Sequence, residues 1–348
     1  MKGLVYKGNN VVKLEDVPEP KIINSGDAII KMTRSTICGS DLHIQHGHIP
    51  YVPIGQTLGH EGVGIVEEAG PSVKKFKKGD HVLITAVTSC ASCDYCRRGM
   101  NSHCRTGGWM LGNSTGGTQA EKVRIPHADS SLYALPEGID ESTLVMLSDI
   151  FPTGFECGVL NGKVAPGNVV AIVGAGPVGL AALITSQLYS PSQIIMVDFD
   201  ENRLKVSKAL GATDTVNNAS GVDAATEAIL KLTNGVGCDS VLEAVGVPAS
   251  FELCQKILAP GGTLANVGVH GAPAPLLLDQ LWDRNISITT RLVDTVTLPM
   301  LLKLVVSKRI DPSLLITHKF KFSDMEQAYD TFGAAAKHKA LKVLIEFD

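Results

Sequence analysis

Four cysteines lie close together in the chain, at Cys90, Cys93, Cys96 and Cys104. Four thiolates from one short segment can close a tetrahedral structural zinc site that leaves no open coordination position. The surrounding lobe, about residues 88–106, contains few apolar side chains, so a metal would replace a hydrophobic core there. Two disulfides or free thiols are the alternative interpretation, and the absence of a secretion signal favours the metal.

A second group of metal-binding residue types is spread over two short motifs. Cys38 opens the sequence CGSDLH, which ends at His43, and both His60 and Glu61 belong to the sequence GHEG. Cysteine and histidine supply ligands that suit zinc. Each residue alone is also compatible with a structural role, so the interpretation depends on the fold that brings the two motifs together.

A glycine-rich motif follows the apolar run 169–173 and precedes a helical pattern. It consists of Gly174, Ala175, Gly176, Pro177, Val178 and Gly179. In a dinucleotide-binding turn, Gly174 forms the tight bend, Gly176 lets the backbone approach the pyrophosphate, and Gly179 permits close packing of helix and strand. The first amides and the dipole of the following helix stabilise the phosphate charge. An ordinary tight turn between strand and helix is the alternative.

An acidic residue, Asp198, ends the next apolar run, about 20 residues after Gly176, as the dinucleotide fingerprint requires. A carboxylate there accepts hydrogen bonds from both ribose hydroxyls and repels the 2′-phosphate of NADP, which predicts NAD as the cofactor. Arg203 lies nearby and would partly offset that repulsion, or it belongs to a solvated helix face.

Composition excludes several classes of function. The chain has 348 residues, 44% hydrophobic and 19% charged, which predicts a folded protein rather than a disordered one. The net charge is −4 and the basic stretch 74–80 is typical of a solvated turn, so neither nucleic acid nor a membrane surface is an expected partner. The N-terminus has no apolar signal region and the apolar stretch 169–184 is interrupted by glycines, so we expect a cytoplasmic protein.

The elements that must position these motifs fall into two regions with different sequence patterns. Residues 1–149 are rich in short strand-like runs separated by Gly and Pro, at 11–14, 27–32, 62–69 and 81–86. From residue 168 onward, strand-like runs occur at 169–173, 194–198, 213–216, 240–245, 263–269 and 286–292. Helical patterns lie between the first five, at 178–189, 201–210, 223–232 and 250–258. This alternation predicts an α/β, doubly wound parallel sheet. The tail 298–348 holds two helical patterns and a final strand, 341–347, and we expect it to pack on the first domain.

Together these motifs make the chain similar to the zinc-dependent medium-chain alcohol dehydrogenases over essentially its whole length. The matching segments are 38–43, 59–64, the four-cysteine lobe, 174–179 and Asp198. The resemblance implies a GroES-like, β-rich catalytic domain at 1–149 and a Rossmann NAD-binding domain at 150–288. It also implies a C-terminal segment, 289–348, that returns to the catalytic domain.

The resemblance implies two zinc ions per chain, one structural and one catalytic. It assigns Cys38 and His60 to the catalytic zinc, with Glu61 beside the metal. The third ligand in the family is a Cys or Asp near the domain crossover, where Asp149 is our choice and Cys157 the competitor.

For the reaction, the resemblance implies that zinc lowers the pKa of an alcohol whose hydride passes to the nicotinamide. Ser40 would then accept the proton, the nicotinamide ribose would pass it on, and His43 would deliver it to water. The family pattern places the remaining cofactor contacts at Val245, Val267, Gly268, Val269 and Lys339, the last at the pyrophosphate. His46 and His48, in the loop after Cys38, are available as polar contacts or are simply loop residues.

The substrate pocket is assigned to Ala86, Trp109 and Leu292. Ala86 stands where many relatives have an aromatic residue, which predicts room for a second substituent and therefore secondary alcohols and ketones. Polyol or threonine dehydrogenation on the same fold is the alternative, and a non-catalytic protein that binds nucleotide and zinc is a remote one. The partner is a small alcohol or carbonyl compound, and a homotetramer is expected, with the run 286–292 pairing between subunits.

Overall fold

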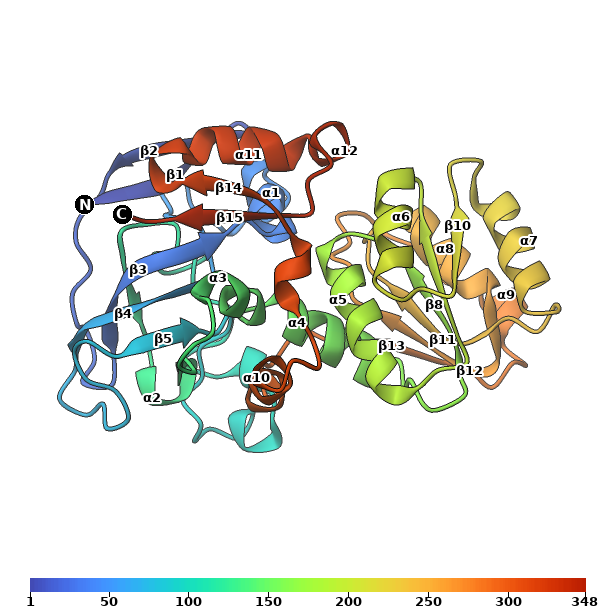
Figure 1. The fold of residues 1–348 in the computed structure, drawn as a ribbon, viewed down its shortest axis with the longest axis horizontal. Helices are drawn as coiled ribbons and strands as arrows, with labels where there is room; N and C mark the ends of the chain where they lie inside the picture. Colours follow the sequence, from blue (N-terminus) through green and yellow to red (C-terminus); the bar gives the residue numbers. More distant parts are fainter. The chain divides into compact units, whose positions relative to one another are not determined.

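The computed structural model describes residues 1–348 and divides the chain into two compact units (Figure 1). The first unit combines Met1–Asp149 with Val293–Asp348, and the second is Ile150–Leu292. Each unit has its own large β-sheet. No single helix is long and apolar enough to span a membrane; the consecutive helical segments Glu141–Leu147 and Ile150–Leu160 meet those criteria only as a pair.

The first unit is built on a seven-stranded sheet in the order β14-β15-β3-β4-β5-β7, with β6 paired to β3. Its strands are β3 (Ala28–Thr36), β4 (Gly62–Ala69), β5 (His81–Ile84), β6 (Lys122–Ile125), β7 (Leu132–Ala134), β14 (Ile316–Lys321) and β15 (Lys342–Glu346). Neighbours are antiparallel except β14 and β15. A separate antiparallel pair joins β1 (Lys2–Gly8) to β2 (Val11–Asp16). In β3, buried Ile30 and Met32 flank exposed Lys31, as expected for a sheet with one face on a core.

Short helices complete the first unit. They are α1 (Gly39–Gln45), η1 (Cys96–Arg98), η2 (Asn101–His103), α2 (Ala128–Ser131), α3 (Glu141–Leu144), η3 (Val145–Leu147), α10 (Leu298–Val306), η6 (Pro312–Leu315), η7 (Phe322–Asp324), α11 (Met325–Gly333) and α12 (Ala335–His338). Ile44 of α1, Tyr329 of α11 and Ile345 of β15 belong to one buried core. This core fixes α1, whose two ends carry Cys38 and His43.

The C-terminal segment is part of the first unit, because β15 pairs with β3 at Leu344 and Thr36. The sequence analysis expected one strand in this tail and missed β14. In β14, half-buried and exposed residues alternate, and the sequence ITHKFK includes two lysines and a histidine. As an edge strand that lacks a continuous apolar run, β14 carries a weak hydrophobic signal.

The second unit contains a six-stranded parallel sheet in the order β10-β9-β8-β11-β12-β13. Its strands are β8 (Val169–Val173), β9 (Gln193–Asp198), β10 (Asp214–Asn217), β11 (Cys238–Glu243), β12 (Leu258–Asn266) and β13 (Ser287–Thr290). The order reverses between β8 and β11, and ligands of such sheets bind outside the carboxyl ends of the strands at that reversal.

Helices cover both faces of this sheet. They are α4 (Ile150–Pro152), the π-helical η4 (Thr153–Leu160), α5 (Pro177–Ser186), η5 (Gln187–Tyr189), α6 (Glu201–Ala209), α7 (Val222–Leu232), α8 (Pro248–Lys256) and α9 (Leu278–Leu281). Ile229 of α7 and Leu253 of α8 share a core with one face of the strands. In Figure 1, α5 and α6 lie over the other face. This arrangement agrees with the predicted doubly wound α/β class.

Three strands end earlier in the structure than the sequence predicted. β11 stops at Glu243 rather than at residue 245, β12 at Asn266 rather than at 269, and β13 at Thr290 rather than at 292. Apolar residues follow each of these ends, namely Val245, Val267, Val269 and Leu292, and they extended the predicted runs. In the fold, the side chains of Val245 and Val269 are 43% and 55% exposed. They lie at the carboxyl ends of the parallel strands, where a ligand is expected.

Candidate metal and nucleotide sites

Helix α1 positions the first metal-binding residue. Cys38 is its N-cap, and the Cys38 backbone N–H donates to Asp41 Oδ2 at 2.9 Å, while the Asp41 N–H donates to the Cys38 carbonyl. This reciprocal pair resembles a capping box, which fixes the direction in which a helix begins. Gln119 Nε2 also donates to Asp41 Oδ2, at 3.2 Å. The turn at Cys38 is therefore held from two sides.

Four predicted residues converge in the first unit. The ligand atoms of Cys38, His60, Glu61 and Asp149 all lie within 4.8 Å of one another. His60 Nε2 is 3.3 Å from Asp149 Oδ2, and Cys38 Sγ is 3.6 Å from the same oxygen. In a tetrahedral zinc site, with Zn–S about 2.3 Å and Zn–N or Zn–O about 2.0–2.2 Å, ligand atoms lie about 3.3–3.8 Å apart. Cys157, the competing ligand, lies in η4 of the second unit.

Asp41 orients His60 from behind. Asp41 Oδ1 lies 3.6 Å from His60 Nδ1, on the side of the ring opposite Asp149. A carboxylate behind a histidine fixes its tautomer and raises its basicity as a metal ligand. Burial lowers the pKa of His60, but the charge of Asp41 and hydrogen bonds with Asp149 and Cys38 raise this pKa well above its usual value. The cluster therefore attracts positive charge, and its Cys, His and carboxylate donors fit a zinc ion that keeps one position open.

A buried ion pair closes the other side of the cluster. Lys342 Nζ lies 2.5 Å from Glu61 Oε2, and it donates to the Ile37 carbonyl at 3.1 Å. Burial lowers the pKa of Lys342, but the charges of Glu61, Cys38 and Asp149 raise it above its usual value. Lys342 is therefore a cation that holds Glu61 beside the donor set.

The proposed relay residues lie on α1. Ser40 Oγ is 3.4 Å from His60 Nε2, so this hydroxyl is next to the cluster. His43, in the last turn, is half-buried. Burial and the charges of His48 and His46 lower the pKa of His43, so the neutral imidazole, a proton acceptor, predominates at pH 7.

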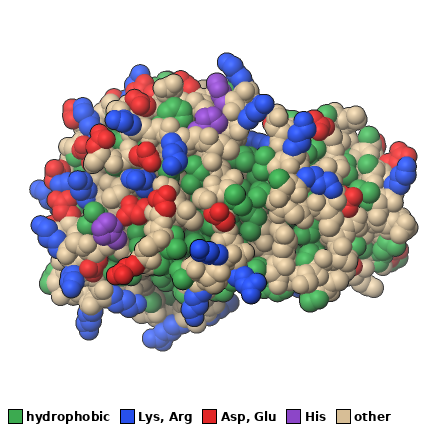
Figure 2. Space-filling model, in the orientation of Figure 1, with side chains coloured by type: hydrophobic (Ala, Val, Ile, Leu, Met, Phe, Trp, Pro, Cys, Tyr) green, Lys and Arg blue, Asp and Glu red, His purple; other side chains and the backbone are tan.

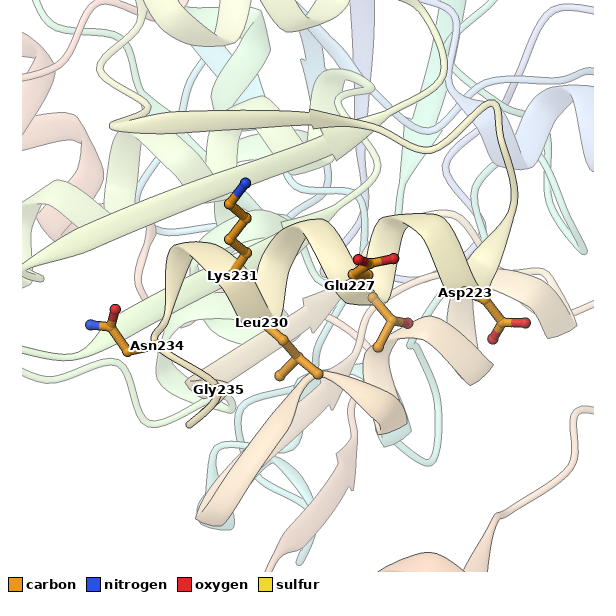
Figure 3. A pocket seen from close by; sticks show the side chains of 7 residues that line it. Asp223, Glu227, Leu230, Lys231, Asn234 and Gly235 are labelled. Carbon is orange, nitrogen blue, oxygen red and sulfur yellow. The ribbon is translucent and has the colours of Figure 1, made fainter.

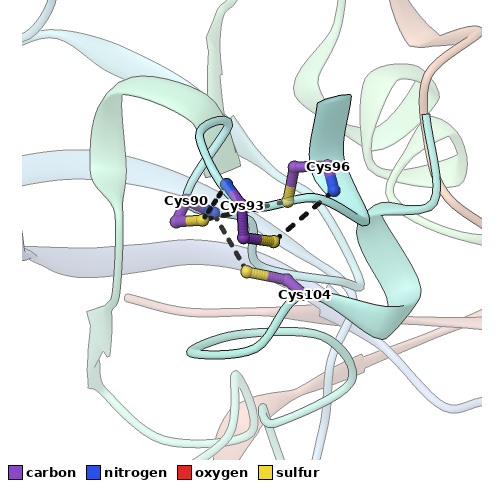
Figure 4. A group of neighbouring side chains, drawn as sticks. All are labelled: Cys90, Cys93, Cys96 and Cys104. Atoms are coloured by element: carbon purple, nitrogen blue, oxygen red, sulfur yellow. Dashed lines mark hydrogen bonds between the residues drawn. The ribbon is translucent and has the colours of Figure 1, made fainter. Parts of the chain in front are cut away.

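The four-cysteine lobe brings its sulfurs together (Figure 4). Cys90 Sγ and Cys96 Sγ are 4.0 Å apart, close to the roughly 3.8 Å between sulfurs in a tetrahedral site with Zn–S of about 2.3 Å. Backbone N–H groups donate to three of the sulfurs. Cys93 N–H donates to Cys90 Sγ, Cys96 N–H to Cys93 Sγ, and Cys90 N–H to Cys104 Sγ. Such bonds stabilise thiolates, the form that binds metal.

Proton affinity is divided unevenly within the lobe. Burial raises the pKa of Cys90, but hydrogen bonds with Ser92 and further bonds with Cys93 and Cys104 lower it to about 5. Burial and the neighbouring Cys93 and Cys104 raise the pKa of Cys96 to about 12. Without a cation, these two sulfurs are therefore in conflict at pH 7, because Cys90 ionises while Cys96 keeps its proton. A divalent ion would remove that conflict, and the donor set fits structural zinc.

The lobe is also tied to the C-terminal segment of the same unit. Ser102 donates to Asp294 Oδ1 through both its N–H and its hydroxyl, and Asn101 Nδ2 donates to the Asp294 carbonyl. Asp294 is buried. These bonds anchor the lobe to a segment that lies far from it in the sequence.

The glycine motif forms the turn between β8 and α5. Gly174 has φ +107°, a conformation that favours glycine, and a Cβ there would lie 2.7 Å from Val245 Cγ2. A Cβ on Gly179 would collide with the Gly174 carbonyl. At Gly176 the nearest atom to such a Cβ is Arg203 Nη1, at 3.9 Å, so open space faces the start of α5. That space, the free first amides of α5 behind Pro177 and the Arg203 guanidinium fit a pyrophosphate.

Asp198 lies at the carboxyl end of β9, beside this turn. Its Oδ2 accepts from the Ala175 N–H at 2.7 Å, and its Oδ1 accepts from the Asp200 N–H at 2.9 Å. Each oxygen retains a second lone pair for a ribose hydroxyl. Asp198 thus both holds the turn and presents negative charge next to it.

The other predicted cofactor contacts are distributed over two strand ends and one helix end. Val245 follows β11, whereas Val267, Gly268 and Val269 follow β12. A Cβ on Gly268 would collide with Gly246 N and Glu243 Oε2. Lys339 is the exposed C-cap of α12 in the first unit, with φ +55°. A contact of Lys339 with the pyrophosphate stays a prediction.

The predicted pocket residues differ in exposure. Ala86 is buried, and its N–H donates to the Ser148 carbonyl next to Asp149. The Trp109 ring meets the His60 ring edge-on, with centroids 6.0 Å apart, so Trp109 lies beside the Cys38 cluster. Leu292, 44% exposed, is the last residue of the second unit.

Sequence reasoning missed two residues of the metal cluster. Asp41 received no role, although an acidic residue three positions after the N-cap was a usable signal. Lys342 was included only as part of a predicted strand. A lysine within the apolar sequence LKVLIEF is unusual, and it suggests a buried ionic partner. No local pattern identifies Glu61 as that partner.

The hollow beside α7 and the charged surface add no site. A hollow of about 570 Å³ lies along α7, lined by Asp223, Thr226, Glu227, Leu230, Lys231 and Asn234 (Figure 3). It is formed by one helix and the loop after it, and it contains no cysteine or histidine. On the face shown in Figure 2, acidic and basic side chains are interspersed. That face offers no broad basic surface of the kind that binds nucleic acid.

Comparisons with known proteins agree with this geometry. Residues 24–137 match the family model described as the alcohol dehydrogenase GroES-like domain, and residues 177–307 match that of the zinc-binding dehydrogenase. An alcohol dehydrogenase of Cupriavidus necator is 34% identical over 366 residues, covering 99% of this chain and 98% of the relative. The NADP-dependent isopropanol dehydrogenase of Thermoanaerobacter brockii is 35% identical, covering 87% and 88%.

Solved structures are similar over the whole chain. The apo form of zinc dependent alcohol dehydrogenase 2 from Streptococcus pneumonia has a TM-score of 0.96 and 50% identity, covering 100% of this chain and 99% of that one. Alcohol dehydrogenase TADH from Thermus sp. ATN1 has a TM-score of 0.91 and 32% identity, covering 100% of both chains.

Proposed function

Since the chain belongs to the zinc-dependent medium-chain alcohol dehydrogenase family and is an alcohol/carbonyl oxidoreductase, we propose that it transfers hydride between secondary alcohols or ketones and NAD(H). The observation that carries this proposal is the convergence of Cys38, His60 and Asp149, with Asp198 placed beside the glycine turn in the second unit.

Cys38, His60 and Asp149 hold the catalytic zinc in this proposal, and Asp41 and the Lys342–Glu61 pair position them. When bound, zinc supplies Lewis acidity that lowers the pKa of an alcohol. The four lobe cysteines hold a second, structural zinc. Trp109 excludes water from the side of His60 on which its ring packs.

The proton of the alcohol passes to this chain's own groups. Ser40 Oγ, adjacent to the cluster, accepts it and offers its own hydroxyl proton onward. His43, kept neutral by burial and by its two histidine neighbours, receives a proton at a ring nitrogen and releases it to water. Both residues lie on α1, so one rigid element sets their spacing.

The proposed preference for NAD rests on Asp198. Relatives of this family include NADP-dependent enzymes, so the fold alone does not select the cofactor. A buried carboxylate beside the pyrophosphate turn supports ribose hydroxyls and opposes a 2′-phosphate. Arg203, close to Gly176, is placed to neutralise the pyrophosphate rather than Asp198.

The proposed substrate class rests on Ala86. Its backbone N–H donates to the carbonyl of Ser148, the residue before Asp149, and in this proposal a larger side chain at position 86 would occupy space at the cluster. The relative that acts on isopropanol, by its name, supports the same class.

We further propose a cytoplasmic homotetramer. All eight cysteines are free, as a reducing compartment requires. β13 is an unpaired edge of its sheet, and Leu278 and Trp282, which precede it in the chain, are 59% and 77% exposed. An unpaired strand edge with exposed apolar residues in the same chain segment favours pairing with a second copy.

The proposal is tested by the change in absorbance at 340 nm with NAD or NADP and a panel of alcohols that includes ethanol, both enantiomers of 2-butanol, a polyol and threonine. We expect the highest kcat/KM with NAD and a 2-butanol enantiomer. A higher kcat/KM with NADP, or with the polyol or threonine, would reject the corresponding part.

A further inference from the structure

Three of the chain's ten histidines lie within the six residues HIQHGH, from His43 to His48. His43 is in the last turn of α1, and His46 is its C-cap. Gly47, with φ +74°, then reverses the chain. The His48 N–H donates to the His43 carbonyl at 2.9 Å, so the reversal brings the third histidine back to the first.

The His48 ring lies beside each of the other two imidazole rings. His43 Nδ1 and His48 Nδ1 are 3.2 Å apart. Two nitrogens at that separation can bind one metal with Zn–N of about 2.0–2.1 Å and an N–Zn–N angle of about 100°, between the octahedral and tetrahedral values. Ring centroids lie 5.5 Å apart for His43 and His48, and 5.7 Å for His46 and His48. Imidazoles that share a tetrahedral zinc have centroids about 5 Å apart at the same bond lengths.

The protonation state also suits metal binding. A metal takes only neutral imidazole, and burial with the charges of His48 and His46 lowers the pKa of His43 below its usual value. His46 and His48 are exposed, so a cation reaches the group directly from solvent. None of the three histidines belongs to the Cys38 cluster or to the four-cysteine lobe.

We propose that His43, His46 and His48 form a third metal site, which takes a borderline divalent cation such as zinc, with water completing its coordination. Imidazole is a preferred ligand of zinc, copper and nickel. His46 and His48 are exposed, at a helix end and on a short turn, so a change of rotamer brings a third nitrogen to an ion held by His43 and His48.

The effect of this third metal on catalysis rests on the proposed function, whereas metal binding by the three histidines does not. A cation on His43 occupies a ring nitrogen with which this residue would accept the relayed proton. Loading of the third site therefore inhibits turnover. The enzyme is then regulated by the free concentration of the same metal that it needs at its other two sites.

Binding is tested first, by equilibrium dialysis of the zinc-loaded enzyme against low micromolar Zn²⁺, with metal analysis per chain. The double variant His46→Gln/His48→Gln removes two ligands and leaves His43 in place. His81→Gln is the matched control, because His81 is exposed and its partner is Glu141. We expect the wild type and the control to bind one more zinc per chain than the double variant. Equal stoichiometry in all three proteins overturns the site.

Inhibition is tested with the same three proteins. The zinc concentration that halves kcat/KM rises at least about tenfold in the double variant. Loss of a group that merely supports a ligand typically lowers metal affinity by about 10–100-fold, and loss of the ligands themselves lowers it further. Unchanged inhibition in the double variant, or full activity of the wild type with the third zinc bound, overturns the regulatory role. If the wild type oxidises no alcohol at all, the proposed function fails, and the dialysis result alone decides the site.

Discussion

Lys342→Met is the substitution that most severely tests how the Cys38 cluster is held. Lys342 and Glu61 are 1% and 2% exposed, and their charged groups lie 2.5 Å apart. Methionine has a similar length and no charge. It leaves the Glu61 carboxylate buried without its cation, and it removes the hydrogen bond to the Ile37 carbonyl.

The expected cost follows from that burial. Breaking a buried ion pair by removing one partner typically destabilises a protein by about 3–5 kcal/mol. Total stabilities are about 5–15 kcal/mol, so the loss is a large fraction. At about 2–4 °C per kcal/mol for a protein of this size, the Tm of the first unfolding transition falls by about 6–20 °C. Removing both charges, in Lys342→Met/Glu61→Gln, restores much of this loss, because no unpaired ion remains.

The assay is thermal unfolding of the zinc-loaded proteins, followed by calorimetry and circular dichroism, with zinc content measured before each scan. Lys122→Met is the control, since Lys122 is partly exposed and pairs with Glu19 and Glu67 at the surface. Its cost should stay within about 1 kcal/mol. The reasoning is wrong if Lys342→Met matches this control, or if the double variant is less stable than Lys342→Met.

Three further predictions concern cofactor, substrate and proton transfer. Asp198→Ala lowers kcat/KM with NAD by about 10–100-fold, because charge-assisted hydrogen bonds worth about 1.5–3 kcal/mol are lost, and it lowers kcat/KM with NADP less; an unchanged NAD/NADP ratio contradicts this. Ala86→Trp lowers kcat/KM on 2-butanol by about 10–200-fold relative to ethanol, and equal loss on both alcohols points to misfolding instead. Burial and the charge of His48 both lower the pKa of His43, so His48→Gln raises this pKa. The acidic limb of the kcat/KM–pH profile therefore moves to higher pH. A limb that stays in place or moves to lower pH refutes the relay.

What the sequence revealed was local. The four lobe cysteines and the glycine motif could be recognised from the sequence, because each set of residues lies in one short segment. The alternation of strand-like and helical patterns after residue 168 predicted the parallel sheet for the same reason, since strands such as β8 and β9 contain continuous apolar runs.

What it did not reveal depends on pairing between distant segments. The partnership of Lys342 with Glu61 arises only when β15 pairs with β3, and β3 in turn with β4. β14 was missed because an edge strand has a weak apolar pattern. The apolar residues Val245 and Val269 were placed inside strands, although they protrude beyond the strand ends, since hydrophobicity alone does not separate a core from a ligand-facing edge.

The central claim is that this chain holds a catalytic zinc at Cys38, His60 and Asp149, and a separate structural zinc in the four-cysteine lobe. The most direct measurement is parallel metal analysis and alcohol oxidation after graded chelation, in the wild type, Cys38→Ala and Cys93→Ala. We predict that mild chelation removes one zinc together with all activity, while the other leaves only on unfolding. Cys38→Ala should fold with one zinc and no turnover, and Cys93→Ala should be unstable. Full activity with a single zinc per chain would contradict the account.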